Sequence, residues 1–333
     1  MANLNKYFKQ FNKGIRLTNS RRKDLKRSSK YLRKKIRIWY KDNKPNEEQP
    51  KFKRQGSLPT DTIVNPIPRY VEENGVDVKK LYYDIDDGCY HIGNKNKEER
   101  HLPSTYHSRI YEAIKGHTNI YPIDKNTCVR TMFSDGRHVD IPIYYMQSDI
   151  PELAHKRDGF IQSDPQEFTN WFNEKADKYS QIRRLVRYSK GWCDFRAFKN
   201  PSQKMPSGLV MSILIAENFH ESEKRDDIAL KETLVLIRRK LQRNFSCERP
   251  TAPKGENLLK DYTNKDYFLK KLDDFIEDAT NALKEMNLKI STGYWIKHLG
   301  DRFPLGEDIQ DANNSEGLAT LIPSTTKPYC SDT

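Results

Sequence analysis

The first half of the chain contains two stretches, residues 81–91 and 128–145, in which hydrophobic and polar residues alternate. Because side chains alternate across a β-strand, this pattern predicts strands with one buried face and one polar face. Asp84 and Asp86 fall on the polar face of the first strand, and Asp140 falls on the polar face of a later one. The pattern therefore predicts two adjacent strands that present three carboxylates on one side of a half-buried sheet.

Turn-forming residues set the expected limits of these strands. Asp87-Gly88 is expected to be the turn that ends the first strand. Ser134-Asp135-Gly136 is expected to split the second stretch into a hairpin. Residues 104–116 can form a short helix between the two stretches, and residues 42–51, with two prolines and no apolar side chain, indicate a linker.

Helical periodicity marks the N-terminus and the whole second half. Residues 20–42 carry Leu, Ile and Trp on one stripe, which predicts a long N-terminal spine helix. Asp164 followed by Pro165 is a strong start signal, and the helix it opens is expected to run toward Trp192. Further helices are predicted over residues 207–220, 227–245 and 265–286.

These elements together predict an α+β protein of two lobes. Residues 1–160 are expected to hold the spine helix and a lobe with a twisted mixed sheet. Residues 161–308 are expected to form a helical lobe, and residues 309–333 a polar C-terminal tail. A chain of 333 residues is long enough to bury a large core in such lobes.

The three acidic side chains indicate a metal site. Like charges a few ångströms apart cannot all stay ionised unless something positive lies among them. Mg²⁺ prefers carboxylate oxygen and binds substrate phosphates, and two such ions can clamp both oxygens of a phosphoryl displacement. Asp-rich strand ends are also common turn material, so Asp84 and Asp86 alone leave both interpretations open.

A second stretch, Gln55-Gly56-Ser57, lies about thirty residues before Asp84. A Gly-Ser pair that closes one element and opens a helix exposes backbone N–H groups, which can cradle phosphates. Alone, the pair indicates only a turn. Followed by Asp-x-Asp and then by a strand-borne Asp, it resembles the arrangement of the polymerase-β-like nucleotidyltransferase superfamily.

An ordered set of motifs narrows this resemblance to the bacterial cGAS/DncV-like nucleotidyltransferases (CD-NTases), which make cyclic oligonucleotides in anti-phage defence. The resemblance runs from about Gln55 to Pro304 and is far more specific as a set than in any one piece. The motifs are Gln55-Gly56-Ser57, Asp84-Ile85-Asp86-Asp87-Gly88, His138-Val139-Asp140-Ile141-Pro142-Ile143-Tyr144, Lys190-Gly191-Trp192, Met205-Pro206-Ser207-Gly208 and Gly300-Asp301-Arg302-Phe303-Pro304.

The resemblance implies a polymerase-β-like catalytic lobe in which Asp84, Asp86 and Asp140 hold two Mg²⁺ or Mn²⁺ ions and carry out catalysis. It also implies that a Gln55-Gly56-Ser57 loop binds the triphosphate of the nucleotide. Asp140 is the expected group that orients or deprotonates the attacking hydroxyl.

Two residues of the helical lobe take nucleotide-binding roles by the same resemblance. Lys190 matches a lysine that reaches the triphosphate, where its charge would offset what the metals leave uncovered. Ser207 begins the next helix, where its hydroxyl and free N–H groups could contact the same phosphates; Gly208 is the alternative register.

The function that this implies is the synthesis of a cyclic di- or trinucleotide second messenger from NTPs, with ATP and GTP the expected substrates. Two alternatives stay open: a nucleotidyltransferase that extends an RNA or tRNA 3′ end, and a catalytically silent RNA or nucleotide sensor. The intact acidic trio argues against silence. A downstream effector that binds the product, and a regulatory or conjugating protein, are the expected partners.

Charge is concentrated at the N-terminus. Residues 1–54 carry 19 Lys and Arg against 4 Asp and Glu, a net of +15, so the rest of the chain contributes −2 to the total of +13. A basic helix can be a nucleic-acid or membrane surface, or a packed spine with a solvated face. We expect the spine, and therefore an enzyme that needs neither nucleic acid nor membrane.

Five widely spaced cysteines without a zinc-ligand pattern predict a reduced, cytoplasmic compartment. The longest apolar run, residues 209–216, is far too short to cross a bilayer, and the first residues do not resemble a signal peptide.

Overall fold

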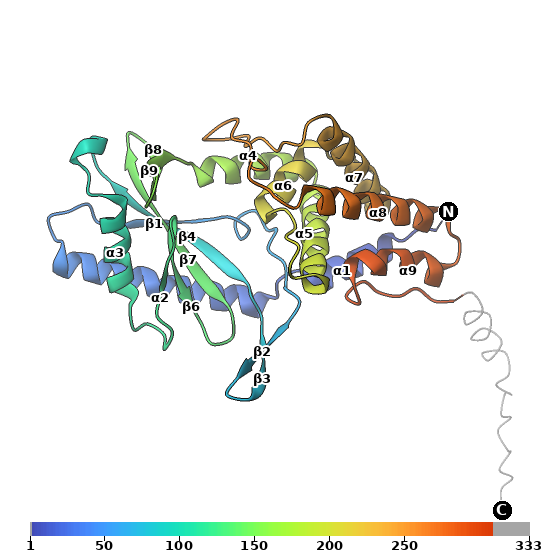
Figure 1. The fold of residues 1–333 in the computed structure, drawn as a ribbon, viewed down its shortest axis with the longest axis horizontal. Helices are drawn as coiled ribbons and strands as arrows, with labels where there is room; N and C mark the ends of the chain where they lie inside the picture. Colours follow the sequence, from blue (N-terminus) through green and yellow to red (C-terminus); the bar gives the residue numbers. More distant parts are fainter. Residues whose placement is uncertain (1, 309–333) are drawn as a thin grey trace, which may run out of the picture.

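The computed structural model describes residues 2–308, so the predicted polar tail at 309–333 lies outside the described residues. Figure 1 shows a sheet-bearing lobe beside a lobe made of helices. In the first lobe a seven-stranded sheet runs in the order β1-β4-β7-β6-β5, with β8 on β7 and β9 on β8. Its strands are β1 (Lys51–Gln55), β4 (Asp84–Ile92), β5 (Ile123–Asp124), β6 (Cys128–Met132), β7 (His138–Gln147), β8 (Ile150–His155) and β9 (Gly159–Gln162).

The sheet is mixed, as predicted. β4 and β7 are parallel, whereas the other pairs of this sheet are antiparallel. The predicted hairpin forms between β6 and β7. A separate two-stranded hairpin, β2 (Arg69–Glu73) and β3 (Val76–Lys80), projects from the junction of the lobes and was not predicted (Figure 1).

The spine helix α2 (Asn19–Asn43) confirms the prediction for residues 20–42. Thr18 caps it by accepting a hydrogen bond from the Arg21 N–H. The helix packs against β4, β7 and α3 (Pro103–Ile114), the short helix expected over 104–116. A 3₁₀ turn at Lys97–Glu99 precedes α3. The buried stripe of α2 consists of Leu25, Leu32, Ile36 and Tyr40; the expected Trp39 is only partly buried.

The predicted turn at Asp87-Gly88 is wrong, because β4 continues through these residues to Ile92. Asp87 is 1% exposed and points toward α2. Ser29 and Arg33 of α2 donate hydrogen bonds to its carboxylate, at 2.5 Å from Ser29 Oγ and 2.6 Å from Arg33 Nε. A partner more than fifty residues away in sequence thus overrides the local turn propensity.

The second lobe consists of α1 (Asn5–Ile15), α4 (Pro165–Lys178), α5 (Gln181–Lys199), α6 (Gly208–Glu217), α7 (Asp226–Arg243), α8 (Lys265–Lys284) and α9 (Leu288–Leu299). Asp164 caps α4 as expected. The predicted single helix from Asp164 to Trp192 is wrong, because the chain breaks between α4 and α5. Arg183 of α5 donates a hydrogen bond to the Ala176 carbonyl at 2.8 Å, which satisfies the end of α4 without helical continuation.

Helix α1 belongs to the core of the helical lobe although it opens the chain. The rings of Phe8 and Trp295 meet edge to face with centroids 4.8 Å apart, and Phe11 stacks on Tyr188. The chain therefore starts in one lobe and continues through α2 into the other (Figure 1). The division at residue 160 stays a proposal. Within residues 2–308 no helix has the length and apolarity needed to cross a membrane.

The packing of α2 can be tested with two isoleucines that lie two residues apart and differ in exposure. Ile36 is fully buried, whereas Ile38 is 49% exposed on the same helix. Replacing Ile36 by Ala should lower the free energy of unfolding by about 2–5 kcal/mol through lost burial and a residual cavity. Ile38→Ala, as the control, should change it by less than about 0.5 kcal/mol. Urea unfolding measures both; equal losses would contradict the burial of this stripe.

Candidate active site

The parallel pairing of β4 with β7 brings the predicted carboxylates together. In its register Asp86 lies opposite Asp140, and Asp84 lies opposite His138. All four residues fall on the sheet face that does not carry Tyr83, Ile85 and Asp87. The alternation of the sequence and the strand register therefore place three acidic side chains at one corner of the sheet.

Positive groups reach two of these three carboxylates. Arg130, which lies opposite Asp140 on β6, forms a fork with it: Nε to Oδ1 is 2.6 Å and Nη2 to Oδ2 is 2.7 Å. His138 Nε2 lies 3.6 Å from Asp84 Oδ2, an ion-pair distance rather than a hydrogen bond. Within residues 2–308, no Lys, Arg or His nitrogen lies within 4.0 Å of the Asp86 carboxylate.

Because only one of the two aspartates on β4 has a positive neighbour, the pKa values of Asp84 and Asp86 move in opposite directions. Burial and the adjacent charges of Asp84 and Asp140 raise the pKa of Asp86 to about 8. Burial alone would also raise the pKa of Asp84, but His138 and the more distant charges of Arg130 and Lys190 outweigh it and hold the pKa below its ordinary value. Asp86 is thus the carboxyl group whose ionised form no positive side chain contacts and stabilises.

The Gly-Ser loop lies directly against that carboxylate. Gly56 has a φ of +74°, and a Cβ at this position would lie 2.4 Å from Asp86 Oδ2. Only glycine suits both the left-handed backbone and the close approach. The expected helix after Ser57 does not form. Residues 56–61 instead make a compact turn, closed by a hydrogen bond from the Thr62 N–H to the Ser57 carbonyl at 2.9 Å.

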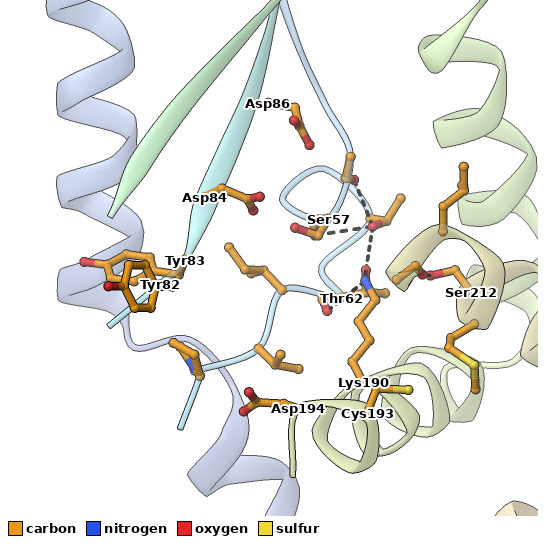
Figure 2. Close-up of a pocket in the computed structure, with 18 of the residues that line it drawn as sticks. Ser57, Thr62, Tyr82, Tyr83, Asp84, Asp86, Lys190, Cys193, Asp194 and Ser212 are labelled. Carbon is orange, nitrogen blue, oxygen red and sulfur yellow. Dashed lines mark hydrogen bonds between the residues drawn. The ribbon is translucent and has the colours of Figure 1, made fainter. Parts of the chain in front are cut away.

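Lys190 reaches this loop from α5 in the other lobe (Figure 2). Its Nζ donates to Thr62 Oγ1 at 3.0 Å and lies 3.4 Å from the Thr62 carbonyl oxygen. Burial lowers the pKa of Lys190 to about 8, while the charges of Asp84 and Asp86 work against that shift. The ammonium group therefore lies against the loop, close enough to Asp84 and Asp86 to interact with their charges, and burial has removed much of its hydration.

A cavity of about 470 Å³ joins these groups. The sheet lobe contributes Ser57, Asp84 and Asp86 to its wall, and the helical lobe contributes Lys190 from α5 together with residues of α6. Figure 2 shows the labelled Asp84, Asp86, Ser57 and Lys190 side chains around this common space. The site therefore lies between the two lobes.

Two of the predicted nucleotide-binding side chains are engaged elsewhere. Gln55 Nε2 donates to the Tyr144 hydroxyl at 3.0 Å, and Gln55 does not line the cavity. Ser207 is exposed and caps α6 by accepting a hydrogen bond from the Val210 N–H, while Gly208 lines the cavity. Gly208, the alternative register, therefore lines the cavity, whereas Ser207 does not.

Four residues that shape the site were not predicted from the sequence. Thr60 and Thr62 line the cavity from the loop, and Arg130 and His138 contact the carboxylates. His138 could have been suspected, because it precedes Asp140 by two and shares its face. The contacts of Arg130 depend on strand register, and those of the threonines on the turn, so neither has a local sequence signal.

The donor set suits a hard divalent cation. One ligand atom each from Asp84, His138 and Asp140 lie within 4.8 Å of one another, and Asp86 offers a further carboxylate beside them. Carboxylate oxygens are the ligands that Mg²⁺ and Mn²⁺ prefer. A bound cation would be the positive partner that Asp86 does not find among the side chains around it.

Comparisons with known proteins agree with this geometry. Residues 50–144 match the family described as cyclic GMP-AMP synthase DncV-like, nucleotidyltransferase domain. A cyclic GMP-AMP synthase from Escherichia albertii is 25% identical over 282 residues, which are 82% of this chain and 59% of that protein. The chain thus spans about three fifths of that relative's length.

Solved structures extend the likeness to both lobes. Vibrio cholerae DncV cyclic AMP-GMP synthase, in complex with nonhydrolyzable GTP, has a TM-score of 0.73 at 17% identity, over 91% of this chain and 97% of that chain. The same synthase with the linear intermediate 5′ pppA(3′,5′)pG has a TM-score of 0.71 at 16% identity, over 92% and 99%. The chain therefore resembles these synthases in sequence over residues 50–144 and shares their fold over both lobes.

The polymerase-β-like fold expected from the sequence is thereby confirmed. The segment that matches the family contains Gly56, Ser57 and the three aspartates, but it ends before α5 and α6. The resemblance thus rests on the sheet lobe in sequence and on both lobes in fold. The roles of the individual site residues stay predictions.

The raised pKa of Asp86 makes a testable statement about pH. Between the unfolded value of about 4 and the folded value of about 8, the folded protein holds a proton that the unfolded chain lacks, so stability falls as pH rises through this window. Asp86→Asn removes that loss. In metal-free buffer the variant should therefore melt above the wild type at about pH 8, with the difference shrinking toward about pH 4.

Thermal unfolding in EDTA at several pH values measures this difference, and Glu223→Gln, at an exposed side chain, serves as the control. Added Mg²⁺ should raise the melting temperature of the wild type more than that of Asp86→Asn. If the difference in melting temperature between Asp86→Asn and the wild type did not change with pH, the raised pKa of Asp86 would be contradicted.

Proposed function

We propose that the protein joins nucleoside triphosphates into a cyclic dinucleotide, with a cyclic trinucleotide as the other ring size open to it. The observation that carries this proposal is the meeting of Asp84, Asp86, a compact Gly-Ser turn and Lys190 in one cavity between two lobes, with Asp140 opposite Asp86 on the neighbouring strand. Carboxylates suit catalytic cations, and the turn and Lys190 suit a triphosphate. The names of the similar proteins, cyclic GMP-AMP synthase and cyclic AMP-GMP synthase, support a cyclic product made from ATP and GTP.

The reaction requires the same bond change twice. The 3′- or 2′-hydroxyl oxygen of one nucleotide attacks the α-phosphorus of another, a new P–O bond forms, and the bond to the β-phosphate breaks to release pyrophosphate. A second transfer between the ends of the linear product closes the ring. Two Mg²⁺ or Mn²⁺ ions, held by Asp84, Asp86 and Asp140, would neutralise phosphate charge and acidify the attacking hydroxyl.

The chain's own residues provide the remaining tasks. N–H groups of the loop at Gly56-Ser57 and the Lys190 ammonium bind the triphosphate and orient the pyrophosphate as leaving group. Arg130 fixes both oxygens of Asp140, so that this carboxylate faces the hydroxyl in one orientation. Asp140 is our candidate to receive the hydroxyl proton.

The biological setting follows from the family resemblance alone. We propose that the product is a second messenger in bacterial anti-phage signalling, formed in the cytoplasm and read by an effector protein that binds it. A regulatory or conjugating protein partner is part of the same proposal.

One observation favours an RNA-directed alternative. A groove of about 820 Å³ runs along the outer face of α2 and includes one residue of β1. It is lined by Lys26, Arg27, Lys30, Tyr31, Arg33, Lys34, Arg37 and Arg54. Such a surface can bind phosphate backbones, so an enzyme that extends an RNA end or a silent RNA sensor remains the second candidate.

Incubation with labelled ATP, GTP, CTP and UTP and either Mg²⁺ or Mn²⁺, followed by mass spectrometry, separates these candidates. The wild type should form a cyclic product without added nucleic acid. Asp84→Ala, Asp86→Ala and Asp140→Ala should form none, because each removes a carboxylate that the reaction requires, while Asp273→Ala at an exposed ion pair should retain activity.

Near wild-type turnover in any of the three variants would show that its carboxylate holds no catalytic metal. A wild type that is inert with NTPs alone but extends added RNA would favour the alternative, and a product that stays linear would exclude ring closure.

A further inference from the structure

Asp61 lies behind the nucleotide-facing loop and does not line the cavity. Three arginines from three parts of the chain converge on its carboxylate. Arg16, in the connection between α1 and α2, lies 2.8 Å from Oδ2, and Arg22 of α2 lies 2.7 Å from Oδ1. Arg187 of α5 lies 3.6 Å from Oδ2 and also donates a hydrogen bond to the Asp61 carbonyl. One acidic residue thus ties the loop to both lobes.

The backbone makes the loop move as a unit with Asp61. The Asp61 N–H donates to the Leu58 carbonyl at 3.2 Å, and the Thr62 N–H donates to the Ser57 carbonyl at 2.9 Å. The Thr60 hydroxyl bonds the Gly56 carbonyl at 3.1 Å. These hydrogen bonds hold residues 56–62 together as one compact turn. A shift of Asp61 would therefore also shift the backbone N–H groups of the turn and the Ser57 hydroxyl at the cavity.

Two side chains of helix α5 donate hydrogen bonds to adjacent residues of this turn. Arg187 binds Asp61, and Lys190, one turn further along the same face of α5, binds Thr62. The position of the Lys190 ammonium relative to the loop therefore depends on both contacts. Asp61 is also the carboxylate that offsets the buried charge of Arg187: burial lowers the pKa of Arg187 to about 10, and Asp61 acts in the opposite direction.

The conformation of Asp61 adds a second constraint. Its φ of +53° lies in the left-handed region, which non-glycine residues seldom adopt and which Asp and Asn tolerate best. The arginine contacts hold the residue in this conformation, and the reversal of the chain at the end of the turn depends on it.

From these contacts we propose that Asp61 is a positioning residue, which through its three arginines sets the loop and Lys190 in the arrangement that binds a triphosphate. This inference rests on the proposed function, since it assumes that the loop receives the triphosphate. Asp61 does not line the cavity, so its effect would pass through Ser57, Thr62 and Lys190, which do. It should therefore govern affinity for the triphosphate group and leave contacts to the base and ribose unchanged.

The test compares the dissociation constants of ATP and AMP, and of GTP and GMP, by calorimetry with Mg²⁺ present. Asp61→Asn removes the charge but keeps the size and the tolerance for a left-handed backbone. It should weaken triphosphate binding about tenfold, the usual cost of losing a charged contact that orders the site. Binding of the monophosphates should not change, whereas general loosening of the cavity would weaken both ligands alike.

Arg16→Gln is a second variant, which should fold like the wild type because the Arg16 side chain is 51% exposed. It should cause a smaller loss of the same kind, and Arg16→Lys should restore affinity. The double variant with Asp61→Asn should be no weaker than Asp61→Asn alone, because Arg16 acts only through Asp61. Arg238→Gln and Asp273→Asn, which break an exposed ion pair with a 2.7 Å contact between α7 and α8, are the matched controls.

Three results would overturn the inference: unchanged triphosphate affinity in Asp61→Asn, equal loss of triphosphate and monophosphate binding, or additive effects in the double variant. A wild type that binds no triphosphate more tightly than its monophosphate would overturn the proposed function as well, and the two failures are thereby distinguished.

Discussion

Repulsion among three carboxylates is the constraint around which the site is built. The β4–β7 register sets Asp86 opposite Asp140, with Asp84 two residues away on the same face. Arg130 covers Asp140, and His138 stands beside Asp84. Asp86 is left with the Gly56 backbone against it and with a pKa raised to about 8 by burial and its acidic neighbours. A site with this imbalance favours any ligand that brings positive charge, and a divalent cation is the ligand that carboxylates select.

The opposite face of the same strand anchors the spine. Even-numbered residues of β4 face the site as far as Asp86, whereas Asp87 points to α2 and receives Ser29 and Arg33. One strand therefore supplies both two of the carboxylates at the site and the acidic partner in the ion pair that holds the long helix. Since α2 continues back to Arg22 and the Asp61 cluster, the sheet, the spine and the loop form a connected support for the cavity.

Much of this arrangement could be predicted where the signal is local. Alternation along two stretches placed the three aspartates on one face, helical periodicity gave α2, and the Asp164 cap gave the start of α4. The errors arose where a distant contact decides the outcome. The local sequence Asp87-Gly88 favours a turn, and only the contact of Asp87 with Arg33 explains why the strand continues. The break after α4 likewise depends on Arg183, which bonds the end of that helix.

The residues expected to bind the nucleotide show the same contrast between local and distant signals. Gly56 was predicted from the local Gly-Ser pair, and in the structure its positive φ and its close approach to Asp86 leave no room for a side chain. Gln55 and Ser207 matched the family motif, yet their side chains bond Tyr144 and cap α6. Arg130 and Asp61 escaped prediction because their partners come from other strands and helices, whose register the sequence does not spell out.

The central claim is that the carboxylate corner binds catalytic cations with a triphosphate between the lobes. A crystal structure with Mn²⁺ and a nonhydrolysable triphosphate tests it most directly, because anomalous scattering locates each manganese ion. We expect manganese peaks in contact with Asp84, Asp86 and Asp140, and a triphosphate bound between the Gly56-Ser57 turn and Lys190. Manganese bound elsewhere, or a triphosphate seated away from Lys190, would contradict it.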